Sequence, residues 1–338
     1  MREGGTAMAE AATNRTDRQD SYERKKESLV RTLGDLALSA LKDPKTVELL
    51  LNDDGVLWQE RLGEDMEAIG RIDPGQALAI VSAVAGINGD VLTEKSPWLE
   101  GEFPLDGSRF TAMIPPVVQA ASFTLRKHAI AVFTLEDYVR KNIMTAAQAA
   151  VIRSAIIEHR NILVVGGTGS GKTTLLNAII DAMTKMCTKE RLVIIEDTRE
   201  IQCKAPNRLP LKTAKRAEPP ITMTDLVKGS LRLRPDRIFV GEVRGPEALD
   251  LLMAWNTGHP GGAASVHAND AIAGMDRMEL LISMHPNCPT ARLQALIAST
   301  VNVVVHISRD GHGSRRVKEI LKVNGLVEGR YQLQPIEA

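Results

Sequence analysis

The sequence predicts an α/β protein of two domains, a mixed α+β domain followed by a mostly parallel sheet with helices on its faces. After residue 134, short apolar runs alternate with segments of helical periodicity, which is the pattern of a parallel sheet. Before that residue, strand-like segments joined by tight turns are mixed with helical segments. With 43% hydrophobic and 25% charged side chains among 338 residues, the chain has the composition of a soluble globular protein with a sizeable core.

The first 28 residues differ from the rest of the chain. They carry charges of both signs and contain no apolar run of the kind found in signal peptides. We therefore expect residues 1–28 to form a charged flexible arm, either disordered or helical. The most apolar long stretch elsewhere, Ala77 to Ile87, has eleven residues, whereas a membrane-spanning helix needs about 20. The sequence therefore predicts no membrane crossing.

Residues 29–134 form the first predicted domain. Apolar residues recur at helical spacing from Leu29 to Leu41, which predicts a helix. The segments Val47–Leu51 and Val56–Leu62 flank a turn at 52–55, which predicts a β-hairpin.

A second helix and further strands follow in this domain. Asp73 before Pro74 is typical of a helix start, and Gly86 and Gly89 are expected to close that helix. Alternating polarity over 99–114, around a turn at 106–107, predicts two strands, and the run 122–126 predicts a third.

Two helix starts mark the boundary between the domains. Thr134 and Thr145 each begin a capping-box pattern, so short helices are expected there, and we place the boundary between residues 134 and 135. The second domain then spans 135–338. Its predicted strands are Asn161–Val165, Arg191–Ile195, Arg237–Val240, Ala263–Val266 and Val301–Ile307. The segment Lys204–Pro220 is rich in proline and basic residues and is expected to be a connection or surface loop.

A glycine-rich loop follows the first of these strands. The run Gly166-Gly167-Thr168-Gly169-Ser170-Gly171-Lys172-Thr173 matches the phosphate-binding pattern GxxxxGK[ST], between a buried strand and a helix beginning near Thr174. In that pattern, backbone N–H groups surround phosphate oxygens, the lysine reaches the β and γ phosphates, and the hydroxyl binds Mg²⁺. The predicted ligands of ATP are Gly167, Thr168, Gly169, Ser170, Gly171, Lys172, Thr173 and Thr174, with Thr173 on Mg²⁺.

Polar side chains follow three other strands of the predicted sheet. Because ligands bind at the carboxyl ends of parallel strands, these side chains are expected beside the phosphates. We predict that Glu242 orients or deprotonates the attacking water. Glu196, followed by Asp197, is suited to the second coordination shell of Mg²⁺, or alternatively to capping a helix. His267 is placed to sense the γ phosphate.

Four motifs in fixed order resemble the secretion NTPases of type II and type IV systems. They are GGTGSGKTT, IIEDTREI, LRLRPDRIFVGEVRGPEA and TGHPGGAASVHAND, and DPKTVELLLNDDGVLWQERLG near the start resembles the conjugal-transfer branch of that family. The resemblance implies a PAS-like N-terminal domain and a RecA-like P-loop ATPase domain that uses ATP and Mg²⁺. It implies a homohexamer on the cytoplasmic face of the inner membrane, working with membrane components of the secretion machinery. It also makes Lys172, Glu196, Glu242 and His267 catalytic, together with Arg109 and Arg126 of the first domain, which match arginines that approach the nucleotide.

Two other functions remain open from the residues alone. A RecA-like translocase stimulated by nucleic acid is suggested by basic residues at Lys204, Arg208, Lys212, Lys215 and Arg216. Direct nucleic-acid binding is nevertheless doubtful, because the net charge is zero and only 3% of residues are aromatic. A small-molecule kinase would require an acceptor pocket with its own base, of which the sequence gives no sign.

Overall fold

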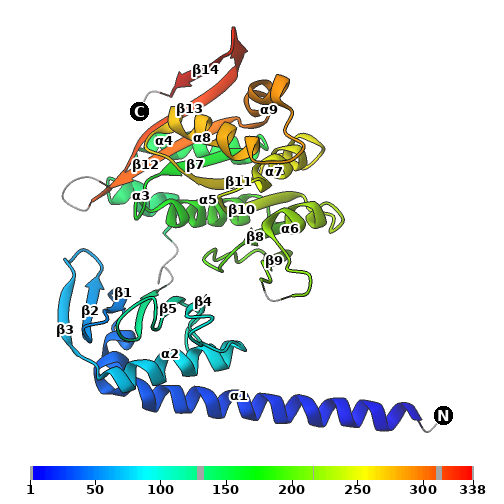
Figure 1. Ribbon diagram of the computed structural model, residues 1–338. Helices are drawn as coiled ribbons and strands as arrows, with labels where there is room; N and C mark the ends of the chain where they lie inside the picture. Colours follow the sequence, from blue (N-terminus) through cyan, green and yellow to red (C-terminus); the bar gives the residue numbers. More distant parts are fainter. Residues whose placement is uncertain (1–2, 128–132, 216, 310–313, 337–338) are drawn as a thin grey trace. The chain divides into compact units, whose positions relative to one another are not determined.

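The computed structural model describes residues 3–127, 133–215, 217–309 and 314–336, with the backbone alone before residue 20. The chain divides into two compact units, Met1–Ile130 and Ala131–Ala338 (Figure 1).

The first unit is an antiparallel sheet covered on one face by two helices. Its described strands form a six-stranded sheet of order β3-β2-β1-β6-β5-β4. Apolar side chains of both helices pack with those of the strands in one core. The elements are α1 (Glu3–Lys42), β1 (Thr46–Leu51), β2 (Val56–Arg61), β3 (Glu67–Arg71), α2 (Pro74–Asn88), β4 (Trp98–Glu102), β5 (Arg109–Met113) and β6 (Ser122–Arg126).

Most predicted elements of this unit are confirmed, with two differences. The carboxylate of Asp73 accepts hydrogen bonds from the N–H groups of Gly75 and Gln76, so α2 begins where predicted. It ends only at Gly89, which has a left-handed φ of 79°, whereas Gly86 lies inside the helix, so the prediction that Gly86 also closes it was wrong. Strand β3 was not predicted. Within the predicted arm, residues 3–28 are helical, because α1 runs from Glu3.

The second unit is a sheet between two layers of helices. Its described strands form an eight-stranded sheet of order β14-β13-β12-β7-β11-β10-β8-β9, parallel from β12 to β9. The strands are β7 (Ile162–Gly166), β8 (Leu192–Glu196), β9 (Arg208–Lys212), β10 (Arg237–Val243), β11 (Ala263–His267), β12 (Val303–Arg309), β13 (Arg315–Val327) and β14 (Arg330–Pro335). The helices are α3 (Leu135–Arg140), α4 (Ala146–Ile157), α5 (Lys172–Met186), α6 (Met223–Ser230), α7 (Glu247–Asn256), α8 (Ala271–Ser283) and α9 (Leu293–Thr300), with a 3₁₀ turn at Thr290–Arg292.

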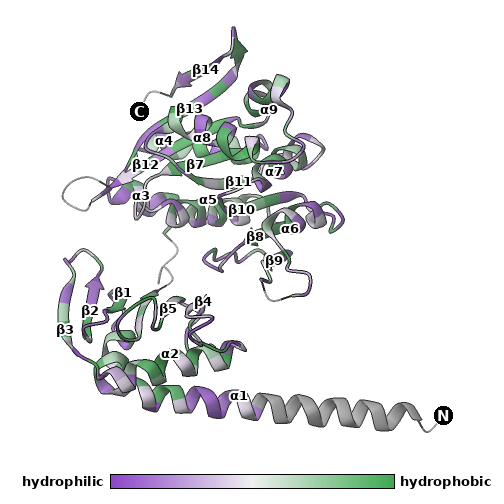
Figure 2. Ribbon diagram, in the orientation of Figure 1, coloured by the Kyte–Doolittle hydropathy of each residue, from purple (hydrophilic) through white to green (hydrophobic). Residues whose placement is uncertain are grey.

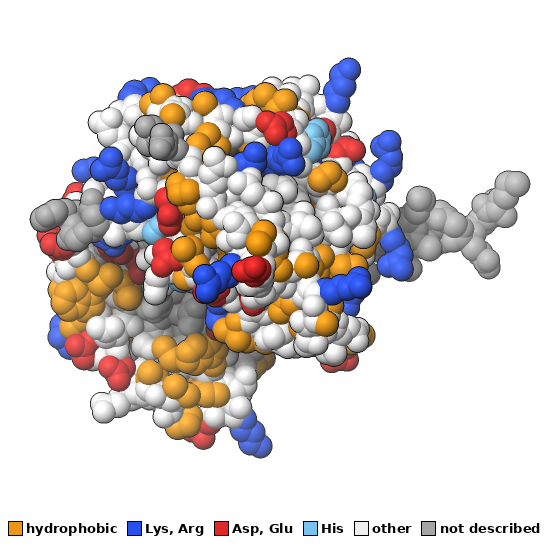
Figure 3. All heavy atoms as spheres, turned by 90° about the horizontal axis from the view of Figure 1, so that it is seen from above, with side chains coloured by type: hydrophobic (Ala, Val, Ile, Leu, Met, Phe, Trp, Pro, Cys, Tyr) orange, Lys and Arg blue, Asp and Glu red, His pale blue; other side chains and the backbone are white. Residues whose placement is uncertain are grey.

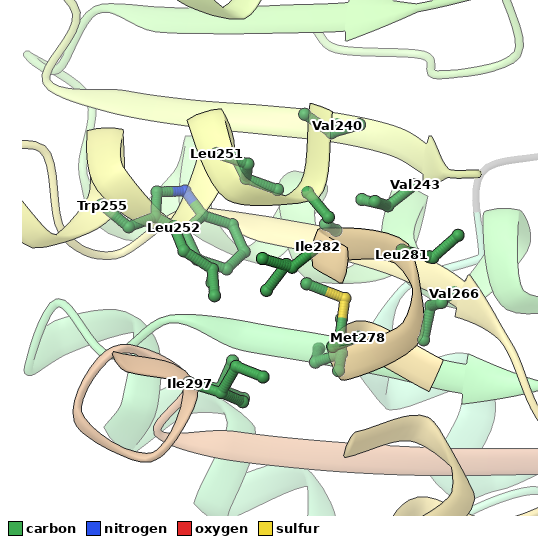
Figure 4. Close-up of a cluster of buried hydrophobic side chains, with 14 of the residues drawn as sticks. Val240, Val243, Leu251, Leu252, Trp255, Val266, Met278, Leu281, Ile282 and Ile297 are labelled. Atoms are coloured by element: carbon green, nitrogen blue, oxygen red, sulfur yellow. The ribbon is translucent and has the colours of Figure 1, made fainter. Parts of the chain in front are cut away.

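Two separate apolar cores hold these layers together. Helices α3, α4 and α5 pack on one face of the sheet, and α7, α8 and α9 pack on the other. Figure 4 shows the core formed with α7, α8 and α9, to which these helices contribute Trp255, Met278 and Ile297 respectively. The apolar colouring of the central strands in Figure 2 follows from this burial on both faces. The sheet is thereby a rigid support for the loops at its carboxyl edge.

The two helix starts predicted near the beginning of this unit are confirmed, and one predicted loop is not. Thr134 and Thr145 each accept a hydrogen bond from the third residue of the helix that follows, and the reciprocal bond completes both capping boxes. The segment Lys204–Pro220, predicted to be a loop, contains β9, which pairs in parallel with β8. Its Pro210 is tolerated because β9 lies at the end of the strand order.

None of the helices in the described part of the chain has the combined length and apolarity needed to cross a membrane.

Candidate active site at the carboxyl edge of the sheet

The glycine-rich loop (residues 166–173) joins the end of β7 to the start of α5. All five residues of β7 are buried, and the loop turns through left-handed φ angles of 68° at Gly169 and 97° at Gly171. A Cβ atom on Gly166 would lie 2.3 Å from the carbonyl oxygen of Ile307, so only glycine fits there. The eight predicted ATP ligands therefore lie in one tight turn and the first turn of α5, as the motif requires.

Two polar side chains of this loop are buried against it. Lys172 is 7% exposed, and its Nζ donates a hydrogen bond to the carbonyl oxygen of Gly167 at 2.9 Å. Ser170 is 2% exposed, and its Oγ has no hydrogen-bond partner among the described residues. Because buried polar atoms in native proteins are normally satisfied, this hydroxyl is left with a hydrogen bond still to make.

Glu242 and His267 lie side by side at the ends of two neighbouring parallel strands. Glu242 is the last residue but one of β10 and His267 ends β11, with 3.7 Å between Glu242 Oε1 and His267 Nε2. The other carboxylate oxygen of Glu242 accepts a hydrogen bond from Arg244 Nε at 2.9 Å. The neighbouring strands are tied together by Ser265, whose Oγ donates to the carbonyl oxygen of Gly241 at 2.6 Å.

The positive charge of Lys172 acts on His267, which lies beside Glu242. Burial lowers the pKa of His267, the Lys172 ammonium lowers it further, and the Glu242 carboxylate opposes both effects. The imidazole is therefore neutral at pH 7 and can donate or accept a hydrogen bond. The structure thus brings Lys172, Glu242 and His267 into one electrostatically coupled cluster.

Glu196 ends β8 and is almost fully buried. It is 4% exposed, and its Oε1 accepts hydrogen bonds at 2.8 Å from the N–H groups of Glu200 and Ile201. A Cβ on Gly241 would lie 3.1 Å from Glu196 Cγ, so the glycine makes room for this side chain. Burial raises the pKa of Glu196 to about 7, although the two backbone donors oppose the rise. Glu196 therefore stabilises the turn after β8, and its carboxyl group loses its proton near pH 7.

Asp197, the next residue, is bound to the segment that directly follows β9. Its carboxylate accepts hydrogen bonds from Thr213 Oγ1 at 2.6 Å and from Lys215 Nζ at 3.2 Å. Burial raises the pKa of Asp197, but the hydrogen bonds from Thr213 and Lys215, together with the positive charges of Lys215 and Arg244, give a lowered pKa.

Arg109 and Arg126 belong to the first unit, where they are directly opposite each other on β5 and β6. Each also faces an acidic residue on its other neighbour, Glu102 on β4 and Glu48 on β1. Arg126 Nε lies 3.5 Å from Glu48 Oε1. Like charges opposed in a sheet repel, and the two acidic residues reduce the repulsion between Arg109 and Arg126.

Two further arginines of the site were missed by sequence reasoning. Arg244 follows Glu242 by two positions, a spacing that places both side chains on one face of a strand and could have been noticed. Arg315, at the start of β13, donates from Nε to the carbonyl oxygen of Gly169 at 3.3 Å. No local pattern connects Arg315 to a loop so distant in the sequence.

Comparison with known proteins gives relatives along nearly the whole chain. The chain is 44% identical over 315 residues to the probable conjugal transfer protein TrbB of Sinorhizobium fredii, covering 93% of this chain and 94% of that protein. It is 32% identical over 300 residues to the type IV secretion system protein PtlH of Bordetella pertussis, covering 80% and 87%.

A solved structure and a family model agree with these relatives. The ATPase DotB of Legionella pneumophila has the same fold, with a TM-score of 0.62 and 21% identity over 84% of this chain and 79% of that one. The family model for type II/IV secretion system proteins matches residues 79–324, the larger part of the chain. The chain therefore belongs to the type II/IV secretion system protein family.

Proposed function

We propose that this chain is an ATP-hydrolysing motor of a conjugative type IV secretion system, supporting pilus assembly or substrate transfer. The observation that carries the proposal is the cluster of Lys172, His267 and Glu242. His267 Nε2 lies 3.7 Å from Glu242 Oε1, and the ammonium group of Lys172, in the glycine-rich loop, lowers the pKa of His267. A phosphate-binding loop beside an acid and a neutral imidazole has the parts that phosphoryl hydrolysis needs. The conjugal transfer protein and the type IV secretion protein among its relatives supply the biological setting.

Binding of the triphosphate rests on groups that are already in position. The N–H groups of the loop and of the first turn of α5 provide a positive end for phosphate oxygens. Lys172 Nζ now donates to a carbonyl oxygen, and a phosphate oxygen is the stronger acceptor for a charged donor. Ser170 Oγ supplies one more hydrogen bond from a buried position.

Hydrolysis requires a base or an orienting group for water, and Glu242 is the candidate. Arg244 holds one carboxylate oxygen of Glu242 while the other faces His267. In the proposed reaction, a water oriented by Glu242 attacks the γ phosphorus and gives a proton to the carboxylate. The bond to the β–γ bridging oxygen breaks, and ADP and inorganic phosphate leave. His267, neutral at pH 7, donates a hydrogen bond to the γ phosphate and loses that bond when phosphate departs.

The residues around the loop also fit Mg²⁺. Thr173 provides a hydroxyl in the first turn of α5, and Glu196 provides a carboxylate suited to binding the ion through water. When bound, Mg²⁺ neutralises charge on the β and γ phosphates.

The finer architecture is part of the proposal. It consists of a charged arm over 1–28, a PAS-like domain over 29–134 and a RecA-like ATPase domain over 135–338. Six copies form a ring on the cytoplasmic face of the inner membrane, in contact with membrane components of the secretion machinery. Arg109 and Arg126 contact the nucleotide from the first domain and stabilise charge as the γ phosphate is transferred.

Nucleic-acid stimulation is the alternative to be tested. Lys215 is bound to Asp197, so part of the positive charge of the basic segment is neutralised within the protein. On the face shown in Figure 3, basic and acidic side chains are interspersed. The alternative predicts that DNA accelerates ATP turnover and that DNA binding weakens steeply with salt.

The proposal is tested by phosphate release and by complementation. Purified full-length protein should release phosphate from Mg²⁺-ATP, with no phosphorylated acceptor. The wild-type gene should restore DNA transfer to a donor strain that lacks it, whereas Lys172→Ala should not. Transfer at the wild-type level with Lys172→Ala would overturn the proposed motor function. Measuring the mass of the protein in solution, with and without ATP, tests whether six copies form a ring.

A further inference from the structure

Arg315 contacts the glycine-rich loop from one side of β7 in the strand order, whereas Glu242 and His267 lie on the other side of that strand. Strand β7, which leads into the loop, lies between β12 and β11 in the sheet. Glu242 and His267 come from β10 and β11 on one side, whereas Arg315 comes from β13 on the other. Two sets of polar side chains therefore approach the same loop from opposite directions.

The Arg315 side chain is packed closely on the loop. Its Nε donates to the carbonyl oxygen of Gly169 at 3.3 Å. A Cβ added to Gly171 would lie 2.9 Å from Arg315 Cδ, so the glycine leaves room for the arginine stem as well as adopting a φ of 97°. The position resembles that of Lys172, whose ammonium also donates to a carbonyl of this loop.

The backbone near Arg315 is fixed by three elements. Val317 donates its N–H to the carbonyl oxygen of Ile143 at 2.8 Å and accepts a hydrogen bond from Gln148 Nε2 at 3.4 Å. Strand β13 also pairs with β12 along its length. On the α3 side, Arg315 is close enough to Tyr138 for its charge to oppose the rise in pKa that burial imposes on the tyrosine hydroxyl.

The charges at this position favour an anion. Arg309 on β12 lies directly opposite Arg315, and like charges in that arrangement repel. An anion bound by Arg315 would reduce that repulsion and would replace the carbonyl oxygen of Gly169 with a stronger acceptor. The phosphate chain of a nucleotide in the loop is the anion that the proposed function supplies.

We infer that Arg315 binds the phosphates that are not transferred, the α and β phosphates of ATP and ADP. This inference rests on the proposed function. The γ phosphate must lie beside Glu242 and His267, so the remainder of the phosphate chain extends toward the β12 and β13 side, where Arg315 lies. Contacts made equally to ATP and ADP change affinity for both and leave discrimination between them unaltered.

The test compares Arg315→Ala with Arg316→Ala in the full-length protein. Arg316 is exposed and is the next residue on the strand, so its side chain points to the opposite face. Equilibrium binding of fluorescent ATP and ADP analogues is measured together with the melting temperature without nucleotide. Arg315→Lys is included, because it keeps the charge and stem if the alanine variant proves unstable.

Arg315→Ala should weaken both ATP and ADP by a similar factor of about tenfold, the loss typical of one charged hydrogen bond. Arg315→Lys should lose less, and Arg316→Ala should match the wild type. Unchanged affinity for both nucleotides in Arg315→Ala and Arg315→Lys would overturn the inference. Weakened ATP with unchanged ADP would also overturn it, because Arg315 would then act on the γ phosphate. If the wild type bound neither nucleotide, the proposed function itself would fail.

Discussion

Glu242 and His267 are brought to 3.7 Å by the parallel pairing of β10 and β11. The pairing is shifted between Val240 and Val243, so the strand is irregular immediately before and at the acid. Arg244 restrains the second oxygen of the carboxylate. The acid therefore lies on the rigid sheet, restrained from two sides, and the imidazole at the end of β11 remains 43% exposed. That arrangement suits a group that must orient a water and then release the product.

Lys172→Ala should abolish tight nucleotide binding while leaving the fold intact. The lysine donates a hydrogen bond to the carbonyl oxygen of Gly167, and it is the charged donor that the phosphates require. We expect affinity for a fluorescent ATP analogue to fall by about tenfold or more. Lys185, an exposed lysine in the last turn of the same helix bound to Asp181, gives the control: Lys185→Ala should bind normally. Wild-type affinity in Lys172→Ala would exclude the loop as the site.

Arg109→Ala and Arg126→Ala should slow ATP hydrolysis far more than they weaken ATP binding. An arginine that stabilises developing charge contributes roughly 10³ to 10⁵ in rate. Arg71→Ala, on the edge strand β3 of the same sheet, is the control and should turn over ATP normally. Turnover at the wild-type rate in both variants would remove the two arginines from the site.

Glu196→Gln should stabilise the nucleotide-free protein above neutral pH. The folded-state pKa of Glu196, about 7, exceeds its ordinary value of 4.5, so its contribution to stability is present below about pH 4.5 and is lost as pH rises to 7. Glutamine keeps the acceptor for Glu200 and Ile201 without the buried charge. The gain in free energy of unfolding should grow from pH 5 to 7 and then level off at about 3 kcal/mol. A gain that does not change with pH, measured by urea unfolding, would contradict this account.

The amino ends of the strands hold a buried ion pair whose loss should be costly. The Arg237 side chain is fully buried and bonded to Glu190, to the carbonyl oxygens of Gly261 and Ile156, and to His159. Glu190→Ala leaves that guanidinium without its counter-charge and should cost about 3–5 kcal/mol in urea unfolding. Glu158→Ala, which removes an exposed ion pair with Arg160, should leave the midpoint unchanged. Equal stability in the two variants would refute the assignment.

Local patterns predicted most of the elements correctly. The caps at Asp73, Thr134 and Thr145 depend on residues within four positions, so they can be read directly from the sequence. Strand β9 was missed because Pro210 and basic residues are typical of a loop, and only its place at the sheet edge makes them tolerable.

The candidate site was predicted only where a motif or a strand end marks it. The glycine-rich loop is continuous in sequence, and Glu242 and His267 follow apolar runs, so each could be found singly. Their separation, the hydrogen bonds that hold Glu196, and the approach of Arg315 depend on strand order. Strand order arises from long-range packing, which periodicity does not encode.

The central claim is that Glu242 activates water for hydrolysis of ATP bound to the glycine-rich loop. Glu242→Gln keeps the shape and the bond from Arg244 but removes the charge that activates water. The direct measurement is ATP affinity and the rate of phosphate release on the same full-length preparation. We predict wild-type affinity with phosphate release slowed by about a hundredfold or more. Phosphate release at a near-wild-type rate would contradict the claim.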